Sequence, residues 1–452
     1  MALQPPYSNY EHEIYVAGML GGRKPARPLD WRELERDAYA MLSRGPSGYI
    51  RDGAGRGHTI RANREAFDEW RIVPRMLRDV SERTLERTVL GMKLPAPVLL
   101  APIGVQTLAH PDGELASARA CAHVGLPLIA STAASHTIEQ IAEAASALTY
   151  GPDAQGQAPH EGQAPHAQGQ GQGQGQAPHI GGQAPHAEGQ APHMEGQAGG
   201  HGFWYQLYWP RDPELARSFI SRAERAGYKA IVVTLDTWLL GWRPADLTDG
   251  FLPFLRGEGN VNYLQDPVFR AALPKPPEED MPSAVAYWAW QFSNPAVSWK
   301  DLAFLRECTK LPIVLKGIQC AEDAQLAVEH GIEGIIVSNH GGRQVDGAIG
   351  SLQALPPVVA AVGDSCEVLF DSGIRSGSDA LKALALGARA VCLGRPYVWG
   401  LALGGEQGVI EVLRAFLAEL DLNMALSGHA SVDELGMHSL VAHPSGRVRA
   451  PA

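Results

Sequence analysis

The sequence predicts a parallel (β/α)8 barrel on the strength of three observations. Eight short apolar runs alternate along the chain with amphipathic stretches of helical spacing. Polar and ionisable residues gather where these apolar runs end. The length of 452 residues suits one large α/β barrel with insertions. Because such barrels carry their chemistry at the carboxyl ends of the strands, we expect an active site there.

The expected elements follow one another in a regular rhythm. The strands are expected at Ala96–Ala101, Pro127–Ser131, Phe203–Tyr208, Ala230–Asp236, Pro312–Lys316, Gly334–Ser338, Val368–Asp371 and Ala390–Gly394. Helices are expected at Leu29–Leu42, Asp112–His123, Thr137–Ala147, Pro213–Ala226, Ala321–His330 and Ser378–Leu386. Suitable N-caps are Asp30, Asp212 and Ser376, and suitable stops are Gly125, Gly227, Gly331 and Gly387. The stretch Ser47–Gly55 is expected to break the first helix.

The chain divides into an N-terminal arm, a barrel and a tail. Residues 1–28 form the arm, 29–420 the barrel with its N-terminal helical segment, and 421–452 the C-terminal tail. Two stretches interrupt the barrel, a low-complexity insertion at 152–200 and a long connection at 244–298 that looks structureless.

The insertion is a repeat with almost nothing to bury. Gly-Gln-Ala-Pro-His occurs five times, ending at His160, His166, His179, His186 and His193. Such a composition predicts a disordered surface loop. The alternative is a metal site built from the histidines, but flexible neutral ligands without fixed geometry bind metals weakly.

Charge and cysteine content exclude several classes of partner. The net charge of −11 and the absence of a Lys/Arg cluster argue against nucleic acid and anionic membranes. The five cysteines form no CxxC pair, which fits a reducing compartment and gives no metal signature. No secretory pattern opens the chain, and no apolar run approaches the roughly 18–20 residues that span a bilayer. We therefore expect a soluble cytoplasmic protein.

One stretch combines a buried strand with a cluster of chemical groups. Gly334–Val337 is apolar and β-branched, and it stops at Ser338-Asn339 before His340, two glycines and Arg343. A histidine can take a proton near neutral pH, and an arginine can clamp a carboxylate. This arrangement predicts chemistry on a small carboxylic acid. The alternative is an ordinary polar loop with a solvated arginine.

Every expected strand ends in residues of this kind. They are Ala101, Pro102, Ile103 and Gly104; Ser131; Gln206 and Tyr208; Thr234, Asp236 and Arg243; Lys316; Ser338, His340 and Arg343; Asp371, Ser372, Gly373 and Arg375; Gly394 and Arg395. The last two groups follow the seventh and eighth strands, where barrels commonly hold a phosphate. No GxGxxG or P-loop pattern follows a strand, so a mononucleotide fits better than a dinucleotide.

The residues Ser338-Asn339-His340-Gly341-Gly342-Arg343-Gln344-Val345-Asp346 resemble the signature of the FMN-dependent α-hydroxy acid oxidising enzymes. The resemblance extends from about Leu29 to about Leu420, and the family lacks the repeat. Within the family the chain is most similar to lactate 2-monooxygenase. The resemblance implies FMN as cofactor, a small 2-hydroxy acid and dioxygen as substrates, and a homo-oligomer, either a tetramer or an octamer.

The resemblance also implies roles at the reacting end of the site. His340 is the base that takes a proton from the substrate, and Asp236 stabilises the imidazolium that forms. The substrate is held by Tyr49, Tyr208, Arg243 and Arg343. From the sequence alone, Tyr49 could equally be a packing residue.

The cofactor roles are implied in the same way. Lys316 lies near the flavin pyrimidine and stabilises negative charge on the ring. Ser131, Gln206 and Thr234 hydrogen-bond the isoalloxazine, and Asp371, Arg375, Gly394 and Arg395 hold the ribityl and phosphate groups. The backbone of Ala101–Gly104 approaches the ring closely, and Ser338, Ser372 and Gly373 complete the set.

Two departures from the family pattern bear on the substrate. Glycolate-oxidising relatives have a tryptophan where this chain has Ala133, and a small residue there resembles members that act on lactate. The connection at 244–298 is long enough to act as a lid. A lid that retained the keto acid beside peroxide would favour its decarboxylation.

Three functions are compatible with these residues. The first is a monooxygenase that converts L-lactate and dioxygen to acetate, carbon dioxide and water. The second is an oxidase or dehydrogenase that releases the keto acid. The third is a flavin-binding protein without turnover, which the pairing of His340 with Arg343 disfavours.

Deleting Asp153 to Gly199 is expected to leave flavin content and turnover close to those of the intact chain. The segment has nothing to bury, and the loop-closure free energy changes only slowly with length. The measurement compares soluble flavoprotein yield and activity of the two chains. Loss of soluble flavoprotein would show that the repeat packs or assembles.

Overall fold

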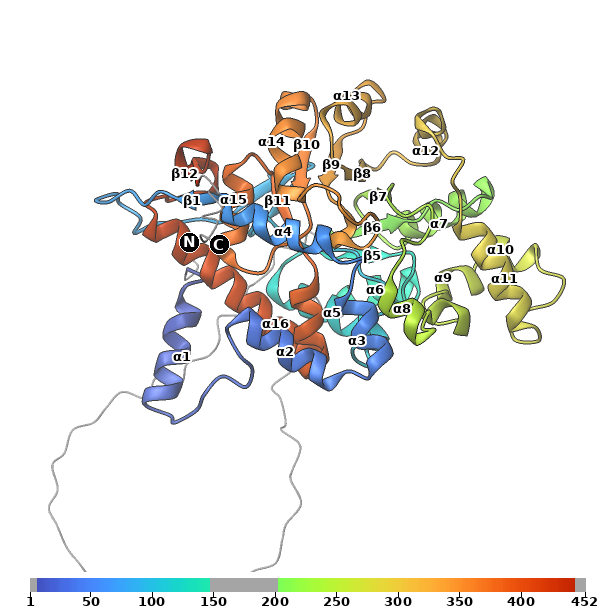
Figure 1. The fold of residues 1–452 in the computed structure, drawn as a ribbon, viewed down its shortest axis with the longest axis horizontal. Coiled ribbons are helices and arrows are strands. Elements are labelled where there is room, and N and C mark those ends of the chain that lie inside the picture. Colours follow the sequence, from blue (N-terminus) through green and yellow to red (C-terminus); the bar gives the residue numbers. More distant parts are fainter. Residues whose placement is uncertain (1–5, 147–201, 444–452) are drawn as a thin grey trace, which may run out of the picture. The chain divides into compact units, whose positions relative to one another are not determined.

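An eight-stranded parallel barrel lies at the centre of the computed structural model, which describes residues 6–146 and 202–443 (Figure 1). The strands run in the order β4-β11-β10-β9-β8-β7-β6-β5. A parallel bridge between Leu100 and Leu128 joins the two ends of this order. The strands are β4 (Val98–Leu100), β5 (Ile129–Ser131), β6 (Trp204–Leu207), β7 (Ile231–Thr234), β8 (Ile313–Ile318), β9 (Gly334–Val337), β10 (Glu367–Phe370) and β11 (Ala390–Leu393). The predicted fold is therefore confirmed. Six strands are shorter than expected, β10 is shifted by one residue, and β8 runs on to Ile318 instead of ending at Lys316.

Alternate residues of each strand face the two sides of the barrel wall. In β9, Ile336 belongs to a buried cluster inside the barrel with residues such as Leu99 and Trp204. Its neighbours Ile335 and Val337 pack outward against the helices. Both faces are covered, which explains why the strands are continuous apolar runs.

Helices follow the strands and cover the barrel. They are α5 (Gly113–Val124), α6 (Ile138–Ser146), α7 (Pro213–Arg225), α12 (Leu302–Cys308), α13 (Ala321–Glu329), α14 (Ser351–Val362), α15 (Gly377–Ala385) and α16 (Arg395–Leu426). The caps predicted for α7 and α15 are present, because Asp212 and Ser376 accept hydrogen bonds from backbone N–H groups of the first turn. The predicted end of α6 at Ala147, like the repeat, lies outside the described residues.

Four helices precede the barrel, namely α1 (Asn9–Met19), α2 (Trp31–Met41), α3 (Arg44–Arg51) and α4 (His58–Asp68). Asp30 caps α2 as predicted, accepting from the backbone N–H groups of Arg32 and Glu33. The prediction that Ser47–Gly55 breaks the helix is wrong for residues 47–51, which belong to α3. The side chains of Arg343 and Arg395 donate hydrogen bonds to carbonyl groups at the end of this helix. Both arginines are distant in the sequence, so no local pattern predicts the helix.

Two further sheets of two strands each pack against the barrel and its helices. The hairpin of β2 (Arg87–Val89) and β3 (Met92–Leu94) packs on the interior cluster of the barrel. Strand β1 (Trp70–Ile72) pairs antiparallel with β12 (Leu440–Ala442). Residues 421–443, predicted as part of a tail, thus continue α16 and end in a strand.

The connection at 244–298 is folded, so its structureless appearance was misleading. It contains α8 (Pro244–Asp249), η3 (Pro253–Arg256), α9 (Val261–Leu264), α10 (Pro267–Ala271) and α11 (Met281–Phe292). The Asn262 side chain accepts from the Ile138 N–H at 3.0 Å and donates to the Thr132 carbonyl at 3.1 Å. Asn262 is fully buried, which shows that the segment is packed onto the barrel.

The remaining short helical turns are η1 (Gln106–Leu108), η4 (Trp299–Asp301), η5 (His340–Gly342), η6 (Gly363–Ser365), η7 (Val432–Glu434) and η8 (Met437–Ser439). Among the described residues, none of the helices has both the length and the apolar character that crossing a bilayer requires.

Candidate active site

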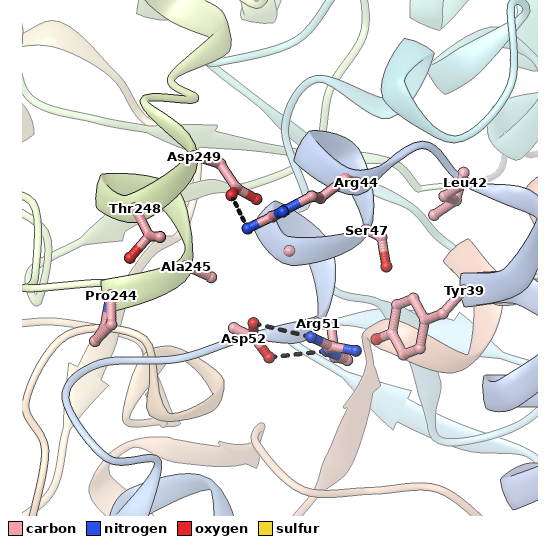
Figure 2. Close-up of a pocket in the computed structure, with 11 residues that line it drawn as sticks. Tyr39, Leu42, Arg44, Ser47, Arg51, Asp52, Pro244, Ala245, Thr248 and Asp249 are labelled. Atoms are coloured by element: carbon pink, nitrogen blue, oxygen red, sulfur yellow. Dashed lines mark hydrogen bonds and ion pairs between the residues drawn. The ribbon is translucent and has the colours of Figure 1, made fainter.

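A cavity of roughly 550 Å³ lies between α2, α3 and α8, but its charged groups are already paired (Figure 2). Arg44 pairs with Asp249 at 2.7 Å, and Arg51 pairs with Asp52 at 2.9 Å. None of the predicted site residues lines this cavity. The candidate site is instead at the carboxyl ends of the barrel strands.

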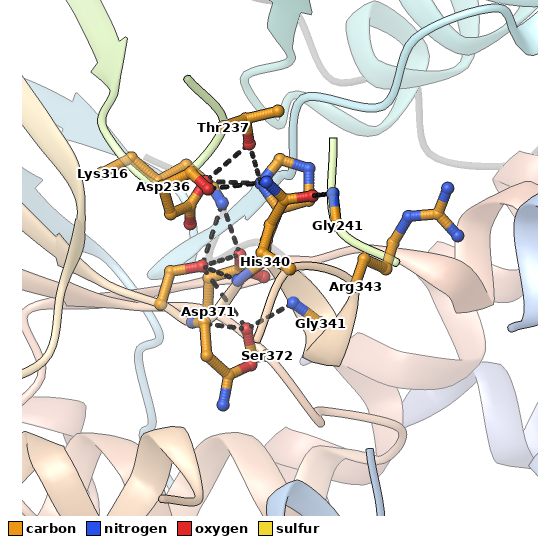
Figure 3. Close-up of polar contacts among 12 residues, drawn as sticks. Asp236, Thr237, Gly241, Lys316, His340, Gly341, Arg343, Asp371 and Ser372 are labelled. Atoms are coloured by element: carbon orange, nitrogen blue, oxygen red, sulfur yellow. Dashed lines mark hydrogen bonds and ion pairs between the residues drawn. The ribbon is translucent and has the colours of Figure 1, made fainter. Parts of the chain in front are cut away.

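The turn after β9 positions the predicted base (Figure 3). His340 has φ +58°, in the left-handed region that is costly for a residue with a side chain. Its N–H donates to the Ser338 hydroxyl at 3.0 Å, and the next N–H, of Gly341, donates to the Ser372 hydroxyl at 3.0 Å. Because strands β9 and β10 are neighbours, serines from both strand ends fix this turn.

Helix α4 holds the same turn from the other side. The side-chain amides of Asn63 and Asn339 donate to each other, at 2.8 and 2.6 Å. Further along, the Asp346 carboxylate accepts from the N–H of His58 at 2.6 Å and of Arg56 at 2.7 Å, which caps the start of α4. The turn is therefore tied to an element almost 300 residues away in the sequence, as the separation of 276 between Asn63 and Asn339 shows.

His340 and Asp236 form a direct pair. The Nδ1 atom of His340 lies 2.7 Å from the Asp236 carboxylate, and the Thr237 hydroxyl donates to the same carboxylate oxygen at 2.8 Å. This bond favours the tautomer with the proton on Nδ1, which leaves the lone pair on Nε2. The arrangement suits a base whose positive charge is stabilised once it has taken a proton.

The electrostatics of this pair keep the histidine neutral. Burial lowers the pKa of His340 below its usual 6.5; Asp236 opposes this effect, while the Lys316 charge adds to it. Burial alone would raise the pKa of Asp236, but His340 and Lys316 outweigh it, so the pKa lies below its usual value. At neutral pH the site thus holds a carboxylate beside an unprotonated imidazole.

Lys316 lies in β8, two residues before its end, and forms a second buried pair. Its ammonium group is 2.9 Å from the Asp371 carboxylate and donates to the Ser338 hydroxyl at 2.9 Å. Burial would lower the pKa of Lys316, but Asp371 and Asp236 outweigh burial and raise it. The site therefore contains a permanent positive charge that can stabilise a developing negative charge.

Of the predicted substrate residues, Arg343 is not directed towards the base. Arg343 donates to the backbone carbonyl of Asp52 at 2.8 Å and to that of Tyr49, and its guanidinium lies 4.9 Å from the Tyr49 ring. Figure 3 shows this guanidinium directed away from the His340 ring. Arg243 is the arginine whose charge acts on His340. Burial and the neighbouring Arg343 lower the pKa of Arg243 to about 10.

Tyr208 is the second tyrosine predicted to hold the substrate. Burial raises the pKa of the Tyr208 phenol, and the charges of Asp236, Lys316 and Arg243 act on it. Tyr208 therefore lies within electrostatic reach of Asp236, Tyr49 and Arg243.

Residues predicted to face the flavin ring lie along β4 to β7. The Ser131 hydroxyl donates to the Gln206 amide oxygen at 2.9 Å, and Thr234 is buried at the end of β7 beside Lys316. After β4, the carbonyl of Ala101 accepts from Tyr397 at 3.0 Å and that of Ile103 from Gln106 at 3.0 Å. The part predicted for Pro102 stays a prediction.

A close approach of backbone explains Gly104, which lies in the same loop as Pro102. A Cβ at that position would lie 2.5 Å from the carbonyl oxygen of Ala133, so only glycine fits.

The predicted phosphate residues lie after β10 and β11. Gly373 and Ser372 have φ of +96° and +89°, and Gly394 precedes the first residue of α16. Arg395 donates to the carbonyls of Ile50 at 3.0 Å and Gly341 at 3.2 Å. Burial, and then the charge of Arg395, lowers the pKa of Arg375 to about 10.

Three functional residues were missed at the sequence level. Thr237 supports both Asp236 and His340, and its position directly after Asp236 was the only signal. Gln344 accepts from Arg243 at 2.7 Å and donates to the Asp236 carbonyl at 2.7 Å, although it stands within the motif. Asn63 lies in α4, where nothing in the sequence singles it out.

Comparison with known proteins shows which family the chain belongs to. The family model described as FMN-dependent dehydrogenase matches residues 38–155 and 187–442. The chain belongs to this family. The unmatched residues 156–186 fall inside the repeat, and the resemblance to the FMN-dependent α-hydroxy acid oxidising enzymes is confirmed at the level of the family.

Relatives of known name cover almost the whole chain. The FMN-dependent α-hydroxy acid dehydrogenase qulF of Penicillium citrinum is 40% identical over 433 residues, 95% of this chain and 94% of its own length. The L-lactate oxidase of Lysinibacillus sphaericus is 39% identical over 422 residues, 93% of this chain and 95% of its own. The crystal structure of mandelate oxidase has a TM-score of 0.69 and 34% identity, covering 92% of this chain and 98% of that one. The protein is thus an FMN-dependent 2-hydroxy acid oxidoreductase.

The buried polar atoms of the site fit FMN. Among the described residues, the buried atoms Gln206 Nε2, Arg375 Nε and Arg395 Nη2 have no protein partner. All three are donors, which matches the carbonyl and phosphate acceptors of FMN. When bound, FMN takes up the two electrons that the substrate loses.

Replacing His340 with Gln is expected to leave FMN bound while slowing flavin reduction by about 10²–10⁴-fold, because the base is lost. The measurement is anaerobic bleaching of the flavin by substrate. His330→Gln, at the exposed end of α13, is the matched control and should bleach normally. Near-normal bleaching of the His340 variant would remove its role as base.

The pH dependence tests the pair of His340 with Asp236. Because the reaction needs the unprotonated base, the rate of flavin reduction should be at its maximum at neutral pH. It should decline as the pH falls through the pKa of His340, which lies below 6.5. Asp236→Asn removes a charge that raises the pKa of His340, so the acid-side inflection should move to lower pH. Without the carboxylate to stabilise imidazolium, the rate at pH 7 should fall by about 10²-fold or more. An inflection that stays in place would show that another group titrates.

Proposed function

We propose that the substrate is a small aliphatic L-2-hydroxy acid, with L-lactate as the leading candidate and dioxygen as the electron acceptor. The observation that carries this proposal is the buried pair of His340 with Asp236 beside Arg243. A base and a cation whose charge acts on it suit one carboxylate and one hydroxyl on adjacent carbon atoms.

Each group has a distinct part in the proposed reaction. Arg243 binds the substrate carboxylate, Arg343 joins it when its guanidinium turns from the carbonyls of Tyr49 and Asp52 towards the base, and Tyr49 and Tyr208 orient the substrate between them. His340 Nε2 takes a proton as the α-carbon is oxidised, and Asp236 stabilises the imidazolium. Lys316 stabilises the negative charge that develops on the cofactor side.

The wall near Ala133 favours a small substrate side chain. Ala133 is buried, and a Cβ on the neighbouring Gly259 would lie 2.5 Å from Val105 and 2.8 Å from Phe254. Protein atoms thus fill the space beside Gly259 and Ala133, which supports a proposal that the substrate side chain is small. The name L-lactate oxidase, carried by a relative 39% identical, agrees with such a substrate.

The fate of the product distinguishes two versions of this function. Aromatic rings connect the two predicted substrate tyrosines through the packed segment: Tyr49 to Phe254 at 6.4 Å, Phe254 to Trp288 at 5.1 Å, Trp288 to Phe292 at 5.4 Å and Phe292 to Tyr208 at 5.1 Å. A packed wall of this kind would retain the keto acid beside peroxide and favour acetate and carbon dioxide, the monooxygenase outcome. The relatives named as oxidases favour the second version, which releases pyruvate and hydrogen peroxide.

Product analysis with L-lactate in air decides between the two. A monooxygenase yields one acetate, one carbon dioxide and one water per dioxygen, whereas an oxidase yields one pyruvate and one hydrogen peroxide. The proposed substrate class is contradicted if neither set of products forms and if L-lactate and other short 2-hydroxy acids fail to bleach the flavin under anaerobic conditions.

Phe254→Leu tests the retaining wall. Loosening the contact with Tyr49 is expected to shift the product from acetate towards pyruvate and free peroxide. Phe269→Leu is the matched control, since Phe269 is buried in the same segment but its ring contacts Tyr263 and Tyr287 instead of Tyr49. If both variants still yield only acetate, the segment does not control retention.

A further inference from the structure

Asp246 in α8 is a carboxylate beside the predicted substrate arginines, and it has no part in the proposed reaction. Its side chain is 12% exposed, and its Oδ2 atom lies 4.0 Å from Nη1 of Arg243. This distance is too long for a hydrogen bond. Within the described part of the chain the carboxylate makes no hydrogen bond, including to the first turn of its own helix. Helix capping by hydrogen bonds therefore does not account for this carboxylate.

The nitrogen of Arg243 that lies nearest to Asp246 is the one left for a ligand. Arg243 Nε donates to the carbonyl of Arg343 at 3.1 Å, and Nη2 donates to the side-chain oxygen of Gln344 at 2.7 Å. These two bonds fix the guanidinium, so its orientation does not require Asp246. Among the described residues, Nη1 has the distant carboxylate as its one polar neighbour. A substrate carboxylate that binds Nη1 therefore meets the Asp246 charge at short range.

The charges of this group suit one carboxylate better than two. Burial raises the pKa of Asp246, and the charges of Arg343 and Arg243 oppose that rise, so the three groups act on one another. Two arginines alone could balance two carboxylates. Because Asp246 supplies one negative charge beside them, the group keeps a single positive charge. A ligand with one carboxylate balances this charge, whereas a second carboxylate stays uncompensated in a poorly solvated place.

We propose that Asp246 is a specificity-determining residue, which restricts the site to 2-hydroxy acids with a single carboxylate group. Its negative charge disfavours dicarboxylic 2-hydroxy acids by repulsion, without a direct bond to the substrate. This inference rests on the proposed function, because it takes Arg243 as the group that binds the substrate carboxylate. It adds the class of acids that the site rejects.

The test measures ligand binding at equilibrium, without turnover. Propionate and malonate are similar in size, but malonate has a second carboxylate where propionate has a methyl group. The dissociation constant of each acid for the FMN-loaded full-length protein is obtained from the change in flavin absorbance. Asp246→Asn is expected to tighten propionate binding by about threefold and malonate binding by about tenfold, because each ligand charge loses one screened repulsion. The ratio of the two constants should thus shift towards malonate by about threefold.

Asp249→Asn is the matched control. It removes the same charge from the same helix, but Asp249 pairs with Arg44 at 2.7 Å beside the cavity of Figure 2. Both dissociation constants should stay within about twofold of wild type in this variant.

An unchanged ratio in the Asp246→Asn variant would overturn the inference. Equal weakening of both acids would also overturn it, because Asp246 would then only support the structure around Arg243. If the ratio shifts but L-lactate fails to bleach the flavin, the proposed substrate is wrong and the inference stands. If the wild-type protein binds neither acid, the carboxylate site is absent and both proposals are wrong.

Discussion

The left-handed backbone of His340 is the constraint on which the site depends. A non-glycine residue in this conformation persists only when its surroundings hold it. Serines from the ends of β9 and β10 accept from the two successive N–H groups, and the amide pair of Asn63 with Asn339 fixes the preceding residue. The conformation directs the imidazole to Asp236 while the chain turns back towards α4. The strain is thus the means by which one short turn brings together a base, a carboxylate and a helix from the beginning of the chain.

Charge balance makes this geometry chemically useful. Lys316 lies between two carboxylates, Asp371 and Asp236, and the latter also contacts the base. The lysine charge and burial together keep the imidazole unprotonated, so that it is ready to accept a proton. Once it does, Asp236 already holds the matching negative charge. The Lys316 charge therefore has two effects. It helps to keep the imidazole neutral before the reaction, and it can stabilise negative charge on the cofactor during the reaction.

The sequence predicted the barrel well because buried parallel strands leave a clear pattern of apolar runs with polar ends. It also predicted the residues at the strand ends, since the topology brings those ends together. It failed where long-range contacts decide local structure. Helix α9 has four residues, too few for a periodic signal, and forms because Asn262 is buried against Thr132 and Ile138. The direction of Arg343 was equally hidden, because its partners are backbone carbonyls that every residue has.

Helix α3 shows why those carbonyls matter. Its eight residues begin after Ser43, whose side chain makes no capping hydrogen bond, and they include two glycines. On propensity alone this helix would not persist. At its carboxyl end, however, Arg343 donates to the carbonyls of Tyr49 and Asp52, and Arg395 donates to that of Ile50. Cations at this end of a helix are favourable both as donors and against the helix dipole. The two arginines, one predicted for the substrate and one for the phosphate, therefore stabilise the helix that carries Tyr49. Because a single short helix is held by both, the predicted substrate end and the predicted phosphate end of the site are tied to the same element.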